Sequence, residues 1–248
     1  IRPSLSFQDN ESIDYSAAVT RDENGDIIKE TENNYLSLNK SYNIRNDIDF
    51  THKFGKIGRT MGIEFNNTIR NTNRENFQTE LLSEANRDSL TNYEYNTEDK
   101  QFSYNLEVNF SEPVGAKGQV SVEYEIDNSD RSSDKKAYIE DESEILNFNT
   151  ELSNEFESRY TTHQGKLSYS IRGFGQFFTI RGTYQHAILN NDQFFPESGT
   201  FQRKFNNFIP SMYGKVNFKG GSDMFFRYSG DTDEPSVSQL QNVVDRSN

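Results

Sequence analysis

Apolar and polar side chains alternate along several runs of about ten residues in this chain. In the clearest run, every even position from 102 to 110 is aromatic or aliphatic, and every position between them is polar. Strict alternation places the two classes of side chain on opposite faces of an extended strand. The pattern therefore predicts β-strands that have one apolar and one polar face.

Four short turns that contain glycine separate these runs in pairs. The turns lie at residues 54–58, 112–118, 172–175 and 219–222. Two alternating runs joined by a tight turn form an antiparallel hairpin. The paired runs are 44–54 with 61–69, 102–110 with 120–126, 167–171 with 178–188, and 212–218 with 224–228. The sequence thus predicts four hairpins.

Two further features extend this count toward the N-terminus. Apolar residues from Leu36 onward keep the parity of Ile48, which predicts one long strand from about 34 to 54. Alternation also runs through residues 13–19 and predicts an earlier strand. The total is about nine or ten strands, in the order of an up-and-down antiparallel sheet.

The connectors at the other ends of the hairpins are several times longer and acidic. Positions 71–99 hold seven acidic residues against two arginines, and positions 127–160 hold ten acidic against four basic residues. We expect these segments to form loops, with 127–134 flexible. They are either solvated loops or extracellular loops that bind a cationic or metal-bearing ligand, or divalent ions around lipopolysaccharide.

Composition narrows the class of protein. The chain has 20 Phe and 13 Tyr but no Trp and no Cys, and only 32% of its 248 residues are hydrophobic. No run approaches the ~18 apolar residues of a membrane-spanning helix, whereas a barrel strand exposes only alternate residues to lipid. The absence of cysteine excludes disulfides and thiol chemistry. A net charge of -13 argues against nucleic acid as a partner.

Phenylalanines gather beside the four short turns. Aromatic girdles form where barrel strands enter the interfacial layer of a membrane, because a ring buries apolar area and tolerates headgroups. The alternative is an apolar cluster that closes one end of a soluble sandwich or barrel. The predicted membrane-interface aromatics are Phe54, Phe110, Phe174, Phe178, Phe218 and Phe226.

Candidate sites for chemistry are few. Residues 22–26 have carboxylate spacing but lack the glycine and glutamate of an EF-hand, so Asn24-Gly25 is interpreted as a type I′ hairpin turn. An acidic turn before Pro235 is interpreted in the same structural way. His52, His163 and His186 lie far apart in sequence on the apolar parity, which favours packed or interfacial histidines over a metal site. No catalytic, cofactor-binding or metal-binding residue is predicted.

The C-terminal residues carry a more specific pattern. In order they contain an aromatic-Pro-Ser strand entry at 208–211, a tight turn at 219–222, an Arg-Tyr-Ser strand at 227–229, and Pro-Ser-x-x-Gln-Leu-Gln at 235–241. This order resembles the outer-membrane β-barrel family of Bacteroidota that includes TonB-dependent-receptor-like proteins. The motif-level resemblance covers residues 208–248. The rest of the chain shares only the general pattern of alternating strands and turns.

The resemblance implies more than periodicity does. Such proteins typically carry an N-terminal carboxypeptidase-regulatory-like domain and a plug before the barrel, and we assign no residue of 1–248 to either part or to a TonB box. Plugged transporters have 22 strands, and an open sheet edge cannot face lipid. Residues 1–248 therefore either form part of a larger closed barrel or close a smaller one by themselves, and we expect the first.

The fold class expected from the sequence is all-β, an antiparallel up-and-down transmembrane β-barrel segment in the cell outer membrane. The expected function is ligand binding and uptake, without enzyme activity or cofactors. Its expected partners are outer-membrane lipid, a TonB-type energy-coupling machinery and an extracellular ligand. The alternatives are a non-transporting barrel that serves as an adhesin or assembly scaffold, and a soluble β-sandwich that binds carbohydrate.

Overall fold

Nine antiparallel strands form the whole of the described structure. The computed structural model describes residues 1–84, 87–141, 143–173, 175–218 and 220–232. The strands are β1 (Arg2–Arg21), β2 (Ile27–Lys53), β3 (Thr60–Glu84), β4 (Arg87–Val114), β5 (Gly118–Glu140), β6 (Leu146–Gly173), β7 (Gln176–Phe195), β8 (Gly199–Asn217) and β9 (Asp223–Ser229). Among the described residues, no helix is long and apolar enough to cross a membrane.

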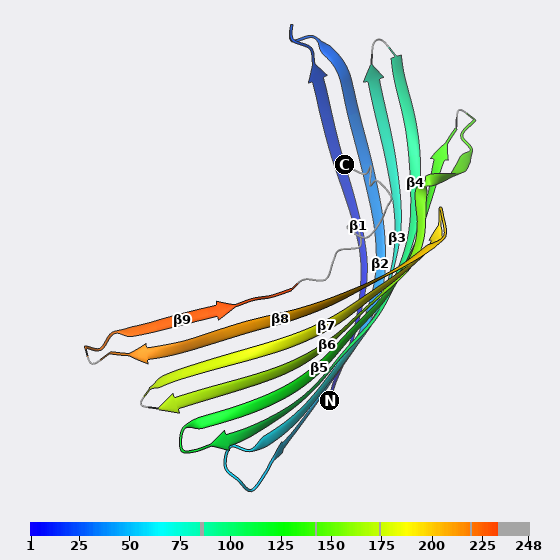
Figure 1. The fold of residues 1–248 in the computed structure, drawn as a ribbon. Helices are drawn as coiled ribbons and strands as arrows, with labels where there is room; N and C mark the ends of the chain where they lie inside the picture. The colour runs from blue at the N-terminus through cyan, green and yellow to red at the C-terminus, as the bar shows by residue number, and fades with distance from the viewer. Residues whose placement is uncertain (85–86, 142, 174, 219, 233–248) are drawn as a thin grey trace.

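Each strand pairs with its neighbours in sequence. The order across the sheet is β1-β2-β3-β4-β5-β6-β7-β8-β9, and β1 and β9 form its two edges. The described residues therefore make one open, up-and-down sheet, which confirms the predicted topology and excludes two packed sheets of a sandwich. The sheet is strongly twisted, so that its edge strands β1 and β9 run in clearly different directions (Figure 1).

The short turns lie where the sequence predicts them. The pairs β2–β3, β4–β5, β6–β7 and β8–β9 are each joined by a few residues at one end of the sheet, which we call the near end. Positive φ angles at Gly58, Gly115, Gly175 and Gly221 explain why these turns need glycine. The four predicted hairpins are thus confirmed.

The predicted long acidic loops at the other end, the far end, are wrong. Residues 71–84 of β3 pair one for one with residues 87–100 of β4, and most of 127–140 pairs with β6 in the same way. A β ladder needs only backbone hydrogen bonds, and polar side chains on both faces do not oppose it when both faces are wet. Alternation of apolar residues therefore could not reveal these far-end strand extensions.

The turn between β1 and β2 is a hairpin, as predicted, but its type differs. Gly25 has φ +92°, whereas Asn24 is not among the residues with positive φ, so the turn is not type I′. Asp22 Oδ1 instead accepts hydrogen bonds from the N–H groups of Asn24 and Asp26, both at 2.9 Å. These two hydrogen bonds to one carboxylate stabilise the loop, so that Gly25 is its one residue with positive φ.

One face of the sheet carries an apolar band in the near-end half of the strands. On β2 the band runs from Ile44 to Phe54, and register rows continue it across the neighbouring strands. One row holds Phe50, Ile63, Val108, Tyr124, Gly165, Tyr184 and Phe208. Most of these side chains are exposed, because no second layer covers them. We call this the apolar face and its opposite the polar face.

The apolar band crosses the register rows obliquely. The row that holds Ile44 also holds Phe102 on β4 but reaches Arg159 on β6. At the near end, the row of Phe226 on β9 includes Ile171 on β6. The band thus shifts by ~1 residue per strand, which corresponds to a strand tilt of roughly 35–40° relative to the band. Such a tilt is the one that strands of a closed barrel adopt.

The buried apolar side chains among the described residues lie on the polar face of β5, β6 and β7, and Ala137 of β5 is 0% exposed. Ala187 and Leu189 are 1% and 0% exposed, and Phe156 is also buried. The hydroxyl of Thr232, three residues after β9, donates a hydrogen bond to Gln185 on this face at 2.8 Å. The polar face is therefore partly covered beside β7.

An aromatic ring covers a glycine on the apolar face near the turns. Gly214 of β8 is the register partner of Phe226 on β9, and a Cβ atom added at Gly214 would lie 2.6 Å from that ring and 2.9 Å from the backbone oxygen of Phe177. A Cβ atom at Gly165, on the same face of β6, would meet nothing within 4 Å. The two glycines therefore form a matched pair for a packing test.

We predict that Gly214→Ala destabilises the barrel by about 1–3 kcal/mol, because the ring and the Phe177 carbonyl cannot both move aside. Gly165→Ala should be neutral. Urea unfolding of the folded protein in lipid vesicles, followed by heat-modifiable electrophoretic mobility, measures both. Equal stability of the two variants would show that the close packing of Phe226 on Gly214 is not required.

Candidate functional site: the polar face of the sheet

A continuous row of polar side chains crosses the polar face at the level of the apolar band. Register places these residues side by side on seven strands: Asp49, Glu64, Glu107, Glu125, Gln164, Gln185 and Asn207. Carboxylates opposite one another repel, so such a row is stable only where water or counter-charges are present. The row indicates a hydrated surface opposite the apolar band.

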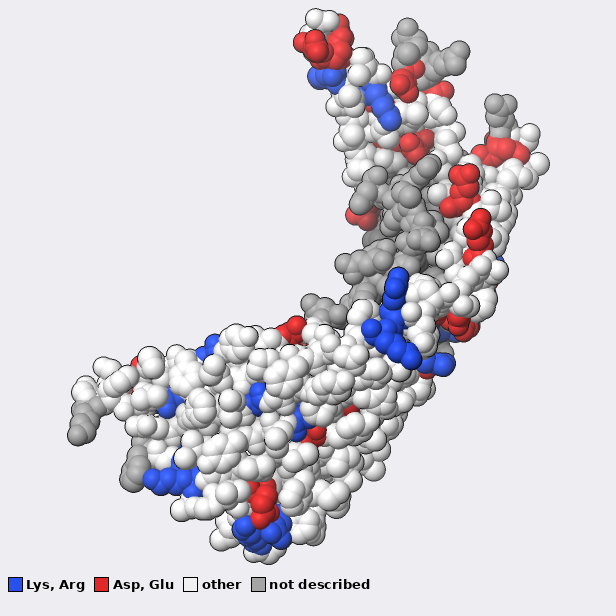
Figure 2. Space-filling model, in the orientation of Figure 1, with Lys and Arg blue, Asp and Glu red and all other residues white. Residues whose placement is uncertain are grey.

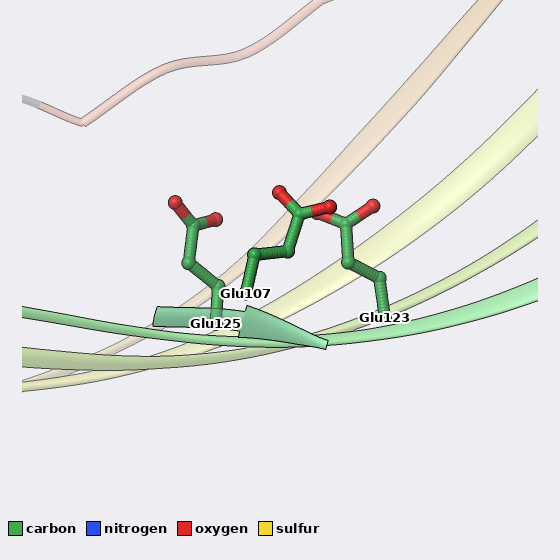
Figure 3. A group of neighbouring side chains, drawn as sticks. All are labelled: Glu107, Glu123 and Glu125. Carbon is green, nitrogen blue, oxygen red and sulfur yellow. The ribbon is translucent and has the colours of Figure 1, made fainter. Parts of the chain in front are cut away.

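Three carboxylates of this region converge on β4 and β5. Oxygen atoms of Glu107, Glu123 and Glu125 lie within 4.8 Å of one another, and the side chains point to the same side of the sheet (Figure 3). The Lys166 ammonium on β6 donates to Glu123 at 2.5 Å and also to Glu125. Asn105 completes the cluster, since its amide donates to Glu125 at 2.7 Å.

Lys166 determines what this cluster can do. Its side chain is only 15% exposed. Its ammonium group neutralises Glu123 and Glu125 in the way that a bound cation would. The arrangement is a half-buried ion-paired network that ties β4, β5 and β6 together. Sequence parity alone placed these glutamates on one face, but their meeting with Lys166 depends on register, so the sequence analysis did not identify the cluster.

The charge on the polar face changes sign beyond the apolar band. The next register row toward the far end still holds Asp47 and Asp127, whereas the four rows after it hold one acidic residue, Asp99, among the described positions of β1–β8. The basic residues of these rows are Arg45, Arg70, Arg74, Arg131, Lys135 and Arg203. A cationic zone therefore begins two rows beyond the row of Asp49 and Glu64.

Most acidic residues of the extensions lie on the opposite face, which continues the apolar face outward. Examples are Glu75, Glu94, Glu98, Asp130, Asp134, Glu155 and Glu157. Figure 2 shows mainly acidic side chains over the far ends of the strands and few charges over the near part of β5–β8. The acidic excess predicted for loops is thus a property of one face of the strand extensions.

Three tyrosines lie farther out on the polar face. Tyr93 and Tyr95 stack with ring centroids 6.1 Å apart, and the Lys135 ammonium lies 4.8 Å above the Tyr95 ring. Burial, with nearby Tyr93 as a second cause, raises the pKa of Tyr95 to about 12. Tyr35 shares the register row of Tyr93. The hydroxyls therefore stay neutral, and the rings offer flat apolar surfaces beside amide side chains.

The three histidines are less scattered than the sequence suggests. His163 and His186 are register partners on β6 and β7, while His52 lies beside Phe54 with ring centroids 4.5 Å apart. His163 Nδ1 pairs with the Tyr124 hydroxyl at 2.8 Å, and His186 Nδ1 pairs with Asn206 Oδ1 at 2.7 Å. Each ring has a local partner, and the pair marks the outer boundary of the apolar band.

The predicted interface aromatics lie at the near end in pairs. Phe54 and Phe110 form an edge contact at 6.1 Å, and Phe178 and Phe226 lie 5.9 Å apart. Phe218 is 52% exposed, and Phe174 lies outside the described residues. Their role at a membrane interface stays a prediction. The acidic turn before Pro235 falls largely outside the described residues as well.

Comparison with known proteins adds one finding. A family model described as "Outer membrane protein beta-barrel family" matches residues 52–248, which include β3–β9. No curated protein matches the chain.

We predict that Lys166→Gln destabilises the folded protein by about 1–3 kcal/mol, because two half-buried carboxylates lose their counter-charge. Lys136→Gln is the control, since Lys136 pairs with Asp134 on an exposed extension and such pairs contribute about 0–1 kcal/mol. Urea unfolding in lipid vesicles measures the difference. If the two substitutions cost the same, the Lys166 cluster does not hold β4–β6 together.

Proposed function

The chain belongs to the outer membrane protein beta-barrel family, and from that premise we propose that it forms part of the wall of a TonB-dependent-receptor-like transporter. Its place is the cell outer membrane. In this proposal the apolar face contacts lipid, the polar face lines the lumen, and a ligand too large for porin diffusion is bound and taken up. The role is binding and transport, and not catalysis.

The observation that carries this proposal is the row of charged and amide side chains opposite the apolar band. Its members extend from Asp49 on β2 to Asn207 on β8 at membrane depth. Ionisable residues at that depth are costly unless they face a water-filled space, and they commonly line a pathway. A purely structural wall packed against an apolar interior would not need them.

The width of the sheet supports a large barrel. Nine strands form one sheet whose edges β1 and β9 remain unpaired in the described structure. Backbone groups at an open edge cannot face lipid, so further strands must complete the wall. Barrels with many strands enclose a lumen that a plug can fill and gate.

The apolar band sets the orientation that we propose. The near-end turns follow the band closely, whereas β2–β6 extend beyond its other boundary by more than ten residues. Outer-membrane barrels have short turns on the periplasmic side and project outside the cell on the other. The far-end extensions would therefore meet the ligand. The same projection is what an adhesin or scaffold would use, and this is the second candidate.

Energised uptake separates the two candidates. We propose to compare wild-type cells, cells that lack the protein, and complemented cells by mass spectrometry of the spent medium, with and without a protonophore. A transporter predicts at least one oligomeric solute whose depletion requires both the protein and the proton-motive force. Identical depletion in all strains, together with lost adhesion or assembly in the deletion strain, would contradict the transporter and favour the scaffold.

A further inference from the structure

A hollow on the polar face lies at the boundary between the apolar band and the far-end extensions. Its volume is about 530 Å³, and three arginines from two strands line it: Arg70 and Arg74 on β3 and Arg131 on β5. The amide side chains of Asn39 and Gln101 complete the wall. The hollow therefore presents guanidinium groups to the space that the polar face encloses.

The arrangement of the arginines follows from strand register. Arg70, Gln101 and Arg131 are consecutive members of one row, so two guanidinium groups flank a neutral amide. Arg74 lies four residues farther along β3, on the same face. Opposite charge is scarce here, because Asp99 is the one acidic side chain that lines the hollow among the described residues, and it is already bound by Arg74 and by the Ser133 hydroxyl at 2.6 Å.

Arg74 and Arg131 already have partners, and Arg70 supplies the available donors. Within the described structure, Arg70 takes part in no ion pair, in contrast to Arg159 on the opposite face, whose Nε lies 2.6 Å from Asp130. A guanidinium group presents several N–H donors in a planar fork that fits the oxygens of a phosphate, sulfate or carboxylate. In a chain with a net charge of -13, this local excess of positive charge is unexpected.

We propose that this hollow is a binding site for an oligoanionic ligand, held by Arg70, Arg74 and Arg131. This inference rests on the proposed function, because it identifies the chemical class of ligand that the lumen mouth receives. The acidic row deeper on the polar face, which includes Glu64, Glu107 and Glu125, repels such a ligand. The anion is therefore retained at the mouth and does not pass freely along this wall.

The test uses the purified protein in lipid nanodiscs with tripolyphosphate as the probe and spermine as the cationic counterpart. Isothermal titration calorimetry should show binding of tripolyphosphate that weakens as salt rises, and no binding of spermine at the hollow. Arg70→Gln should weaken tripolyphosphate binding about tenfold. Gln101→Glu, which inserts a carboxylate between Arg70 and Arg131, should weaken it at least as much.

Arg159→Gln is the matched control, because Arg159 lies at nearly the same height on the opposite face. This variant should stay within twofold of the wild type, and heat-modifiable mobility confirms that all variants are folded. An equal loss in Arg159→Gln, or a lack of tripolyphosphate binding by the wild type, would overturn the anion site. If binding fails while energised uptake succeeds, the transporter stands without this site. If binding holds while uptake fails, the site stands without transport.

Discussion

Backbone hydrogen bonding in a membrane is the constraint on which this structure depends. Lipid offers no partner for an N–H or C=O group, so every strand that crosses it must be paired on both sides. The ladder from β2 to β8 meets this requirement over long stretches, with 25 residue pairs between β2 and β3 alone. The alternation of side chains and the tilt of the apolar band both follow from this ladder.

The same ladder determines which side chains meet. Register brings Glu107, Glu125 and Lys166 together from three strands, and it places Arg70 and Arg131 on either side of Gln101. It also places most acidic residues of the far-end extensions on one face and the cationic zone on the other. A shift of one residue in any strand would exchange the faces and mix these groups. The function that we propose for the polar face thus depends on strand register.

The sequence was sufficient for the near-end half of each hairpin. There, alternation such as that of residues 102–110 reports directly on the two faces, and glycine marks the turns. The sequence was insufficient beyond the apolar band. Polar residues such as Glu75 and Glu98 show no alternation of apolar and polar positions there, although their backbone groups still pair with the neighbouring strands. The sequence could not bring His163 beside His186, or Lys166 beside Glu123, because such contacts depend on the register of strands joined by turns of unknown geometry. The predicted type I′ turn at Asn24-Gly25 was wrong for a similar reason. The Asp22 carboxylate accepts hydrogen bonds from the loop backbone and stabilises a different turn.

The central claim is that the apolar face contacts lipid between well-defined limits while the polar face is wet. The chain contains no cysteine, so single cysteines with nitroxide labels can be placed at each position from 94 to 110 of β4 in the protein reconstituted into lipid vesicles. The account predicts that even positions 102–110 are accessible to oxygen and odd positions to a water-soluble nickel complex, and that both parities are accessible to nickel before residue 100. Uniform nickel accessibility throughout, or alternation of the opposite phase, would contradict it.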